Sequence, residues 1–198
     1  MLLPNLHILG IQGSGKGTQV TQLVQHFQLT PIATGELFRA RAQVPDEYGA
    51  YVAKHLEAGE LLTAEDLRLI LETKLKTLEP GKGILGDGVL RTVEQWEMLK
   101  DLWPQYGLGE PMLIFLNLPD QIARERIKRR HGIEDRSDDL PHAIERRIEL
   151  FHQKTMAVVE LFTTHGRCAT IDAQGEVGEI TSRITKAVHT FFPEFTKS

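Results

Sequence analysis

The sequence predicts an α/β fold of three layers (α/β/α), in which a five-stranded parallel sheet lies between helices. Short apolar runs alternate along the 198 residues with segments whose apolar side chains recur at helical spacing. This alternation is typical of strand–helix–strand units. Met112–Leu118 is a nearly unbroken apolar run, as expected for a parallel strand that is covered on both faces. Ligands in such sheets bind at the carboxyl ends of the strands.

Four of the five strands are assigned to apolar segments, and no apolar run is assigned to the fifth. The four are Leu6–Leu9, which stops at Gly10, Ile84–Leu85, Met112–Leu118 and Ala169–Ile171. Helical spacing covers Lys16–Phe27, Gly35–Gln43, Tyr48–Glu57, Ala64–Leu78, Thr92–Leu102, Pro119–Arg130, Pro141–Phe162 and Glu176–Phe192. Thr34, and Thr63 with Asp66 three residues later, are predicted to cap two of these helices.

The composition is that of a globular domain, with 41% hydrophobic and 25% charged residues. These values exclude collagens, coiled coils and largely disordered chains. The single cysteine, Cys168, excludes an internal disulfide and any zinc site with two or more thiolates. We expect a buried Cys168 and a cytoplasmic monomer in a reducing compartment. The net charge of −4 favours neither a nucleic acid polymer nor a membrane as partner, and no apolar run reaches the length of a membrane span.

The most informative segment is the loop from Gly10 to Thr18, which reads Gly-Ile-Gln-Gly-Ser-Gly-Lys-Gly-Thr. Its glycines let backbone N–H groups approach phosphate oxygens, and the following helix directs its N-terminal dipole at the same anion. Lys16 is placed to reach the β- and γ-phosphates of a nucleotide, so the loop reads as a P-loop. Gly17 stands where many such loops carry a hydroxyl ligand, so we expect Mg²⁺ to be held through waters.

Five further stretches of the chain follow the loop and carry residues of interest. They are Ala33–Arg39, Ala58–Thr63, Gly86–Thr92 with Gln95, the arginines Arg126, Arg130, Arg136 and Arg147, and Ile171–Ala173. Together with the Gly-Lys-Gly-Thr ending of the loop, they resemble adenylate kinase and related nucleoside monophosphate kinases over nearly the whole chain. The resemblance implies phosphoryl transfer from ATP to AMP with Mg²⁺. It also implies one P-loop domain over residues 1–198 with two mobile lids, at residues 33–62 for the monophosphate and 126–137 for ATP.

The resemblance also implies a role for each site residue. The catalytic set is Lys16, Asp87, Arg91, Arg126, Arg130, Arg136 and Arg147. The ATP-binding set is Gly13, Ser14, Gly15, Lys16, Gly17, Thr18, Arg126, Arg130 and Gly175. The AMP-binding set is Thr34, Gly35, Arg39, Leu56, Glu60, Leu61, Leu62, Gly88, Arg91, Gln95, Arg136 and Arg147. Asp87 is expected to orient the water shell of Mg²⁺, and the Gln95 carboxamide to read adenine through two hydrogen bonds.

The distribution of arginines supports binding of phosphate groups. Seven of the 13 arginines lie between Arg124 and Arg147, in a chain of net negative charge. A guanidinium offers phosphate oxygens a fixed fork of donors. Arg124, Arg129 and Arg146 are instead expected to lie on solvated helix faces beside carboxylates such as Glu125 and Glu145. The few residues between Arg130 and Arg136 make the lid the short form, which leaves no room for a zinc site.

One departure keeps alternatives open. Val89-Leu90 stands where the similar kinases usually carry Phe-Pro, and a turn without proline is expected to bind the acceptor less well. The chain is then either an adenylate kinase, a kinase for another monophosphate such as UMP or CMP, or a catalytically weak nucleotide sensor. Thr34 and Gln95 favour AMP as acceptor.

Overall fold

A computed structural model describes residues 2–130, 140–193 and 195 of the chain. Five parallel strands form one sheet in the order β2-β3-β1-β4-β5, which confirms the predicted fold class. The strands are β1 (Asn5–Gly10), β2 (Thr30–Ala33), β3 (Ile84–Asp87), β4 (Met112–Asn117) and β5 (Cys168–Asp172). The strand without an assigned segment is β2. It lies at the edge of the sheet and buries only Ile32, so it has no apolar run.

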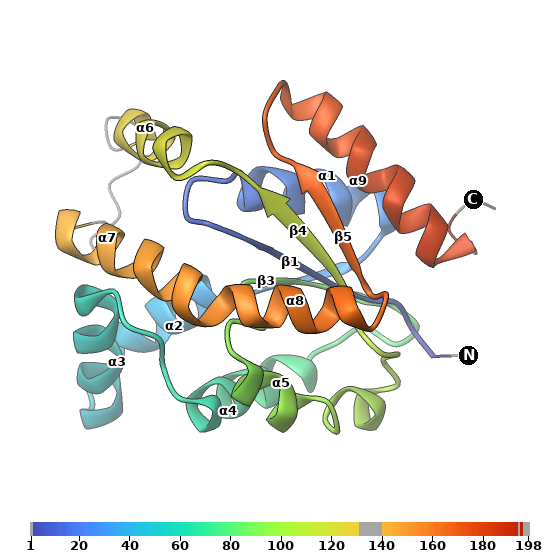
Figure 1. The fold of residues 1–198 in the computed structure, drawn as a ribbon. Coiled ribbons are helices and arrows are strands. Elements are labelled where there is room, and N and C mark those ends of the chain that lie inside the picture. The colour runs from blue at the N-terminus through green and yellow to red at the C-terminus, as the bar shows by residue number, and fades with distance from the viewer. Residues whose placement is uncertain (1, 131–139, 194, 196–198) are drawn as a thin grey trace.

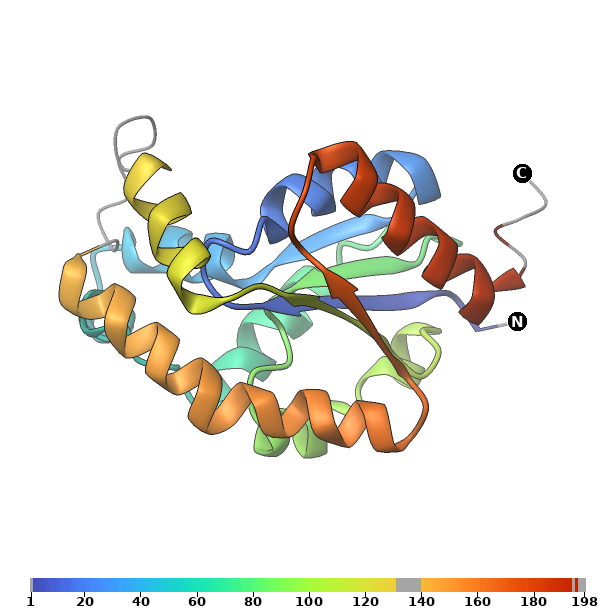
Figure 2. The same cartoon turned by 45° about the horizontal axis from the view of Figure 1, so that its top comes forward.

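Helices cover both faces of the sheet, as Figure 2 shows with the blue and red helices above the strands and the orange helix below. One face carries α1 (Lys16–Phe27) and α9 (Val177–Phe191). The other carries α4 (Ala64–Leu75), α5 (Val93–Leu99) and α8 (Met156–Thr164). The two faces account for the unbroken apolar run in β4, because successive side chains point to opposite sides of a strand. Ile114 packs with the α1 and α9 layer and Phe115 with the other layer.

The remaining helices gather at the carboxyl ends of the strands, away from both termini (Figure 1). They are α2 (Thr34–Ala42), α3 (Glu47–Ala58), α6 (Asp120–Arg130) and α7 (Pro141–Leu150). The strand ends, the phosphate loop and these four helices therefore surround one region of the molecule, as the α/β sheet predicts.

Several predicted helix boundaries are wrong. The helix from Ala64 ends at Leu75 and not at Leu78, and the helix from Thr92 ends at Leu99 and not at Leu102, with a separate 3-10 helix at Trp103–Tyr106 beyond it. Pro104 lies in the first turn of this 3-10 helix, where its missing N–H removes no helical hydrogen bond. The predicted long helix from Pro141 contains a π-helical turn, Phe151–Thr155, between α7 and α8. No sequence pattern marks this turn.

One of the two capping predictions is confirmed and the other is wrong. Thr63 and Asp66 form the expected capping box at the start of α4. Thr34 does not cap α2, because it is already the first helical residue, and the hydroxyl is engaged elsewhere.

Cys168 is half-buried rather than buried, and its partial burial raises the pKa of the thiol. Within the described ranges, no helix combines the length and apolar character needed to cross a membrane.

Candidate active site

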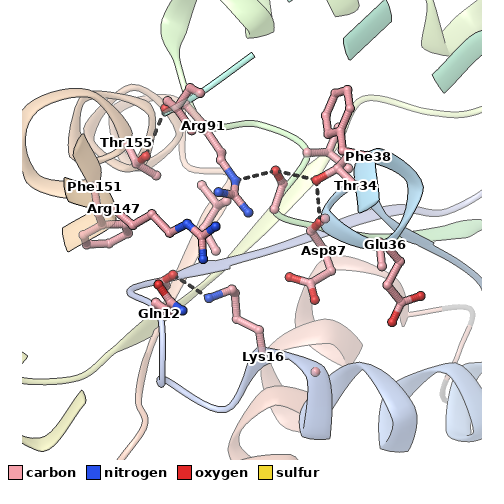
Figure 3. Close-up of a pocket in the computed structure, with 18 of the residues that line it drawn as sticks. Gln12, Lys16, Thr34, Glu36, Phe38, Asp87, Arg91, Arg147, Phe151 and Thr155 are labelled. Atoms are coloured by element: carbon pink, nitrogen blue, oxygen red, sulfur yellow. Dashed lines mark hydrogen bonds between the residues drawn. The ribbon is translucent and has the colours of Figure 1, made fainter. Parts of the chain in front are cut away.

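A cavity of about 620 Å³ opens at the carboxyl ends of β1 and β3. The phosphate loop forms its floor, α2 and the end of α3 form one wall, and α6, α7 and the π turn form another. Figure 3 shows the Lys16 amine and the Asp87 carboxylate on facing sides, with the guanidinium groups of Arg91 and Arg147 beside them. Charged side chains from different elements therefore meet in the middle of this cavity.

The phosphate loop is held in a tight conformation by its own backbone. Gly13 has φ +86°, and a Cβ there would lie 2.7 Å from the Ala123 carbonyl of α6, so only glycine fits. Lys16 donates from Nζ to the carbonyls of Gly10 at 2.7 Å and Ile11 at 3.1 Å. The amine therefore lies at the mouth of the loop, where a phosphate group can replace these carbonyls as its partner.

The turn after β3, residues 87–92, faces the phosphate loop across the cavity. Thr34 donates its hydroxyl to the carbonyls of Asp87 at 3.2 Å and Gly88 at 3.1 Å. Gln95 is buried, and its Oε1 accepts from the backbone N–H groups of Arg91 at 2.8 Å and Thr92 at 3.2 Å. The carboxamide oxygen thus already has two donors within the chain, and the reading of adenine by this carboxamide stays a prediction. The Nε2 group is the one left to address a ligand.

Three arginines, Arg39, Arg91 and Arg147, converge on the side of the cavity that residues 87–92 form. Arg39 packs over Gly35, where a Cβ would lie 3.3 Å from Nη1, and Arg91 packs over Gly88. Arg91 donates from Nε to the Gly88 carbonyl at 2.9 Å. Burial lowers the pKa of Arg91, the charges of Arg147 and Arg39 lower it further, and Asp87 opposes them. Like charges crowded in this way are stabilised by an anion between them, which is what a phosphate group supplies.

A family model for adenylate kinase matches residues 8–167 of the chain. The chain belongs to the adenylate kinase family. It is therefore a member of a family of phosphotransferases, as the resemblance implied.

Curated adenylate kinases are similar over nearly their whole length. The adenylate kinase of Micrococcus luteus is 30% identical over 92% of this chain and 89% of its own. That of Stenotrophomonas maltophilia (strain K279a) is 32% identical over 92% of this chain and 98% of its own. The adenylate kinase of Porphyromonas gingivalis is 31% identical over 94% of this chain and 96% of its own.

Most of the site residues inferred from the adenylate kinase resemblance line this one cavity. They are Gly13, Gly15, Lys16, Gly17, Thr18, Thr34, Gly35, Arg39, Leu56, Glu60, Leu61, Leu62, Asp87, Gly88, Arg91, Gln95, Arg126 and Arg147.

Four of the inferred residues are not placed in the lining. Ser14 is buried beneath the loop against Gly10, and Gly175 lies in the loop beyond Ala173, whose carbonyl accepts from Arg126 at 3.1 Å. Arg130 ends α6, and Arg136 lies outside the described residues.

The cavity also contains residues that sequence reasoning missed. Gln12 and Glu36 line it, from the phosphate loop and α2, and Figure 3 shows both side chains directed into it. Their positions within the recognised motifs were a usable signal. Phe38 and Thr155 line it as well. Phe38 lies one helical turn beyond Thr34, whereas nothing in the sequence marked Thr155.

The three arginines predicted to be solvated do have carboxylate partners. Arg124 pairs with Glu145 at 2.8 Å, Arg129 with Glu125 at 3.9 Å, and Arg146 with Glu149 at 2.8 Å. These pairs lie on exposed helix surfaces, where an ion pair contributes little to stability. None of the three arginines lines the cavity.

Proposed function

We propose that this protein transfers the γ-phosphoryl group of ATP to AMP, which gives two molecules of ADP. The observation that supports this most directly is the arrangement of cations in one cavity. Lys16 lies on the phosphate-loop side, and Arg39, Arg91 and Arg147 lie on the side of residues 87–92, which we call the acceptor turn. Two phosphate-bearing ligands placed end to end between these groups bring donor and acceptor together. Catalysis of phosphoryl transfer consists mainly of such positioning and charge stabilisation.

On the donor side, the loop glycines and Lys16 bind the ATP phosphates. Arg126 reaches across to the Ala173 carbonyl, which places its guanidinium between α6 and the loop after β5. We assign that region to the donor nucleotide. On the acceptor side, Leu56, Leu61 and Leu62 contribute apolar surface for a base, while Arg39 and Arg91 hold its phosphate.

Mg²⁺ fits this site as a water-bound ion. Among the described residues, no group of three or more His, Cys, Asp or Glu side chains is placed to hold a metal. Asp87 presents a single carboxylate to the cavity opposite Lys16 (Figure 3). Mg²⁺ bound with nucleotides keeps several waters and takes few protein ligands, so one carboxylate is enough to orient it. When bound, the ion neutralises charge on the transferring phosphates.

Residues 33–62 and 126–137 act as lids in this proposal, although residues 131–137 lie outside the described part. The first lid already lies against the helix that follows the second. Arg147 donates from Nη2 to the Leu56 carbonyl at 3.1 Å, and a Cβ on Gly59 would lie 2.5 Å from the Ala143 carbonyl. Closure of both lids excludes water, which favours AMP over water as phosphoryl acceptor.

The first test is the choice of acceptor. With ATP as donor, we expect kcat/KM for AMP to exceed those for UMP, CMP and GMP by at least about 10²-fold. Gln95→Ala should reduce this preference while KM for ATP stays within about twofold, because the lost amide faces the acceptor base and not the donor. Initial rates with the four monophosphates measure both quantities. Equal rates with UMP and AMP would instead identify a kinase of another specificity, and no turnover with any of them would identify a nucleotide sensor.

Arg147 provides a second test. Arg147→Lys keeps the charge but loses the planar fork, so we expect kcat to fall by about tenfold or more with smaller changes in either KM. Arg146→Lys is the matched control, because Arg146 lies beside it in the sequence and pairs with Glu149 on the outer surface. A rise in KM for ATP alone would make Arg147 a donor-binding residue.

A further inference from the structure

Buried polar side chains converge on the acceptor turn. Within the described residues, seven polar side chains are buried, and three of them, Thr34, Gln95 and Thr155, bond to the backbone of residues 87–92. Thr155 donates its hydroxyl to the Arg91 carbonyl at 3.0 Å. Burying a polar group costs free energy unless it is paired, so these three side chains are buried because they bond the backbone of the turn.

The bond made by Thr155 differs from the bonds that most threonines inside the described helices make. A threonine inside a helix commonly donates to the carbonyl four residues earlier. Six threonines in the described helices do so: Thr21, Thr73, Thr163, Thr164, Thr181 and Thr190. Thr155 reaches instead to a residue 64 positions away. Its hydroxyl therefore serves the acceptor turn rather than its own helix.

The π turn gives Thr155 a fixed place. Met156 donates its backbone N–H to the Phe151 carbonyl, which is the five-residue spacing of a π turn, and Thr155 is the last residue within it. Phe151 stacks on Phe115 of β4 with ring centroids 6.2 Å apart, so the turn is anchored to the sheet. Single π turns inside α-helices are frequent at functional sites.

Arg91 is the residue that this arrangement holds. Its carbonyl accepts from Thr155, its N–H donates to Gln95, and its guanidinium folds back onto the Gly88 carbonyl. Arg39 and Arg147 place like charges nearby, and these favour movement of the guanidinium out of the cavity when its backbone is free. We propose that Thr155 is a positioning residue, which keeps Arg91 directed at the acceptor phosphate. The inference rests on the proposed function.

Three variants test this role of Thr155. Thr155→Val removes the hydroxyl at nearly constant volume, and Thr155→Ser keeps the hydroxyl. Thr163→Val is the control. Thr163 bonds the Val159 carbonyl within α8, away from the cavity. Initial rates give kcat and both KM values, calorimetry gives AMP affinity, and thermal melting reports stability. We expect Thr155→Val to raise KM and Kd for AMP about tenfold and KM for ATP by less than about twofold, since a buried carbonyl loses its donor. Thr155→Ser should restore AMP binding to within about threefold of the wild type.

Thr163→Val should leave the kinetic constants unchanged. A purely structural role for Thr155 would lower the melting temperature and leave KM for AMP unchanged, which overturns the inference. An equal rise in both KM values, or no recovery in Thr155→Ser, also overturns it. If Thr155→Val does not fold, Thr155→Ala takes its place with the same expectation. If the wild type phosphorylates AMP and Thr155→Val has the same KM for AMP, this inference alone is wrong. If the wild type does not phosphorylate AMP, the proposed function and the inference are both wrong.

Discussion

Replacing Lys16 with alanine is expected to lower kcat for AMP phosphorylation by at least about 10³-fold. The amine is the charged donor of the phosphate loop, and it lies at the mouth of that loop on the carbonyls of Gly10 and Ile11. In the proposed reaction, this amine stabilises negative charge on the transferring phosphoryl group of ATP. A methyl group at this position supplies no donor to phosphate oxygens. Initial rates at saturating ATP and AMP measure the loss directly.

The fold should survive this change, because Lys16 is half-buried and its amine bonds loop carbonyls at the edge of the cavity rather than packing in the core. A melting temperature within a few degrees of the wild-type value would separate lost chemistry from lost structure. Lys154→Ala is a suitable control, because that lysine is exposed and does not line the cavity. A Lys16→Ala enzyme that retained a tenth of wild-type turnover would show that the loop acts through its backbone alone.

Features encoded by short local patterns were predictable from the sequence. The phosphate loop follows a strand and begins a helix, so its sequence pattern alone identifies Gly13, Lys16 and their neighbours as phosphate-binding candidates. The unbroken apolar run of β4 follows from its burial on both faces, with Ile114 and Phe115 in opposite layers. Residues that belong to motifs, such as Thr34 and Arg91, were placed correctly in the cavity, because a motif constrains both identity and location.

Features that depend on distant partners were not predictable. β2 buries only Ile32, so its pairing with β3 gives no apolar signal. Thr34 has the residue type of a helix cap, but tertiary contacts direct its hydroxyl to the turn after β3. Thr155 lies in a helix by every local measure, and its role depends on a carbonyl 64 residues earlier in the chain.

The Val89-Leu90 pair shows how packing changes an interpretation made from sequence. A turn without proline was expected to be freer, yet both residues are buried in the core, with exposed fractions of 1% and 0%. Thr34, Gln95 and Thr155 bond the backbone on either side of the pair. These contacts restrict the turn in place of a proline ring. The pair therefore gives less support to a weak nucleotide sensor than the sequence suggested.

Gly88→Ala is expected to lower kcat/KM for AMP by about 10²-fold or more, with little change in ATP binding. Gly88 has φ +66°, and a Cβ there would lie 2.6 Å from Nη2 of Arg91 and 3.1 Å from its Nε. The new methyl group thus pushes the guanidinium away from the acceptor phosphate. A displacement of about 1 Å in a positioning group is enough for a rate loss of this size.

Backbone strain at a positive φ also destabilises any alanine at this position, by about 1–2 kcal/mol. Gly166→Ala isolates that effect, because Gly166 has φ +65° and a Cβ there would meet no atom within 4 Å. Both variants should therefore lose a similar amount of stability, measured by urea unfolding, while only Gly88→Ala loses AMP turnover. If Gly88→Ala keeps the kcat/KM of Gly166→Ala, the guanidinium of Arg91 has room to move without cost, and its contact with Gly88 does not set the acceptor site.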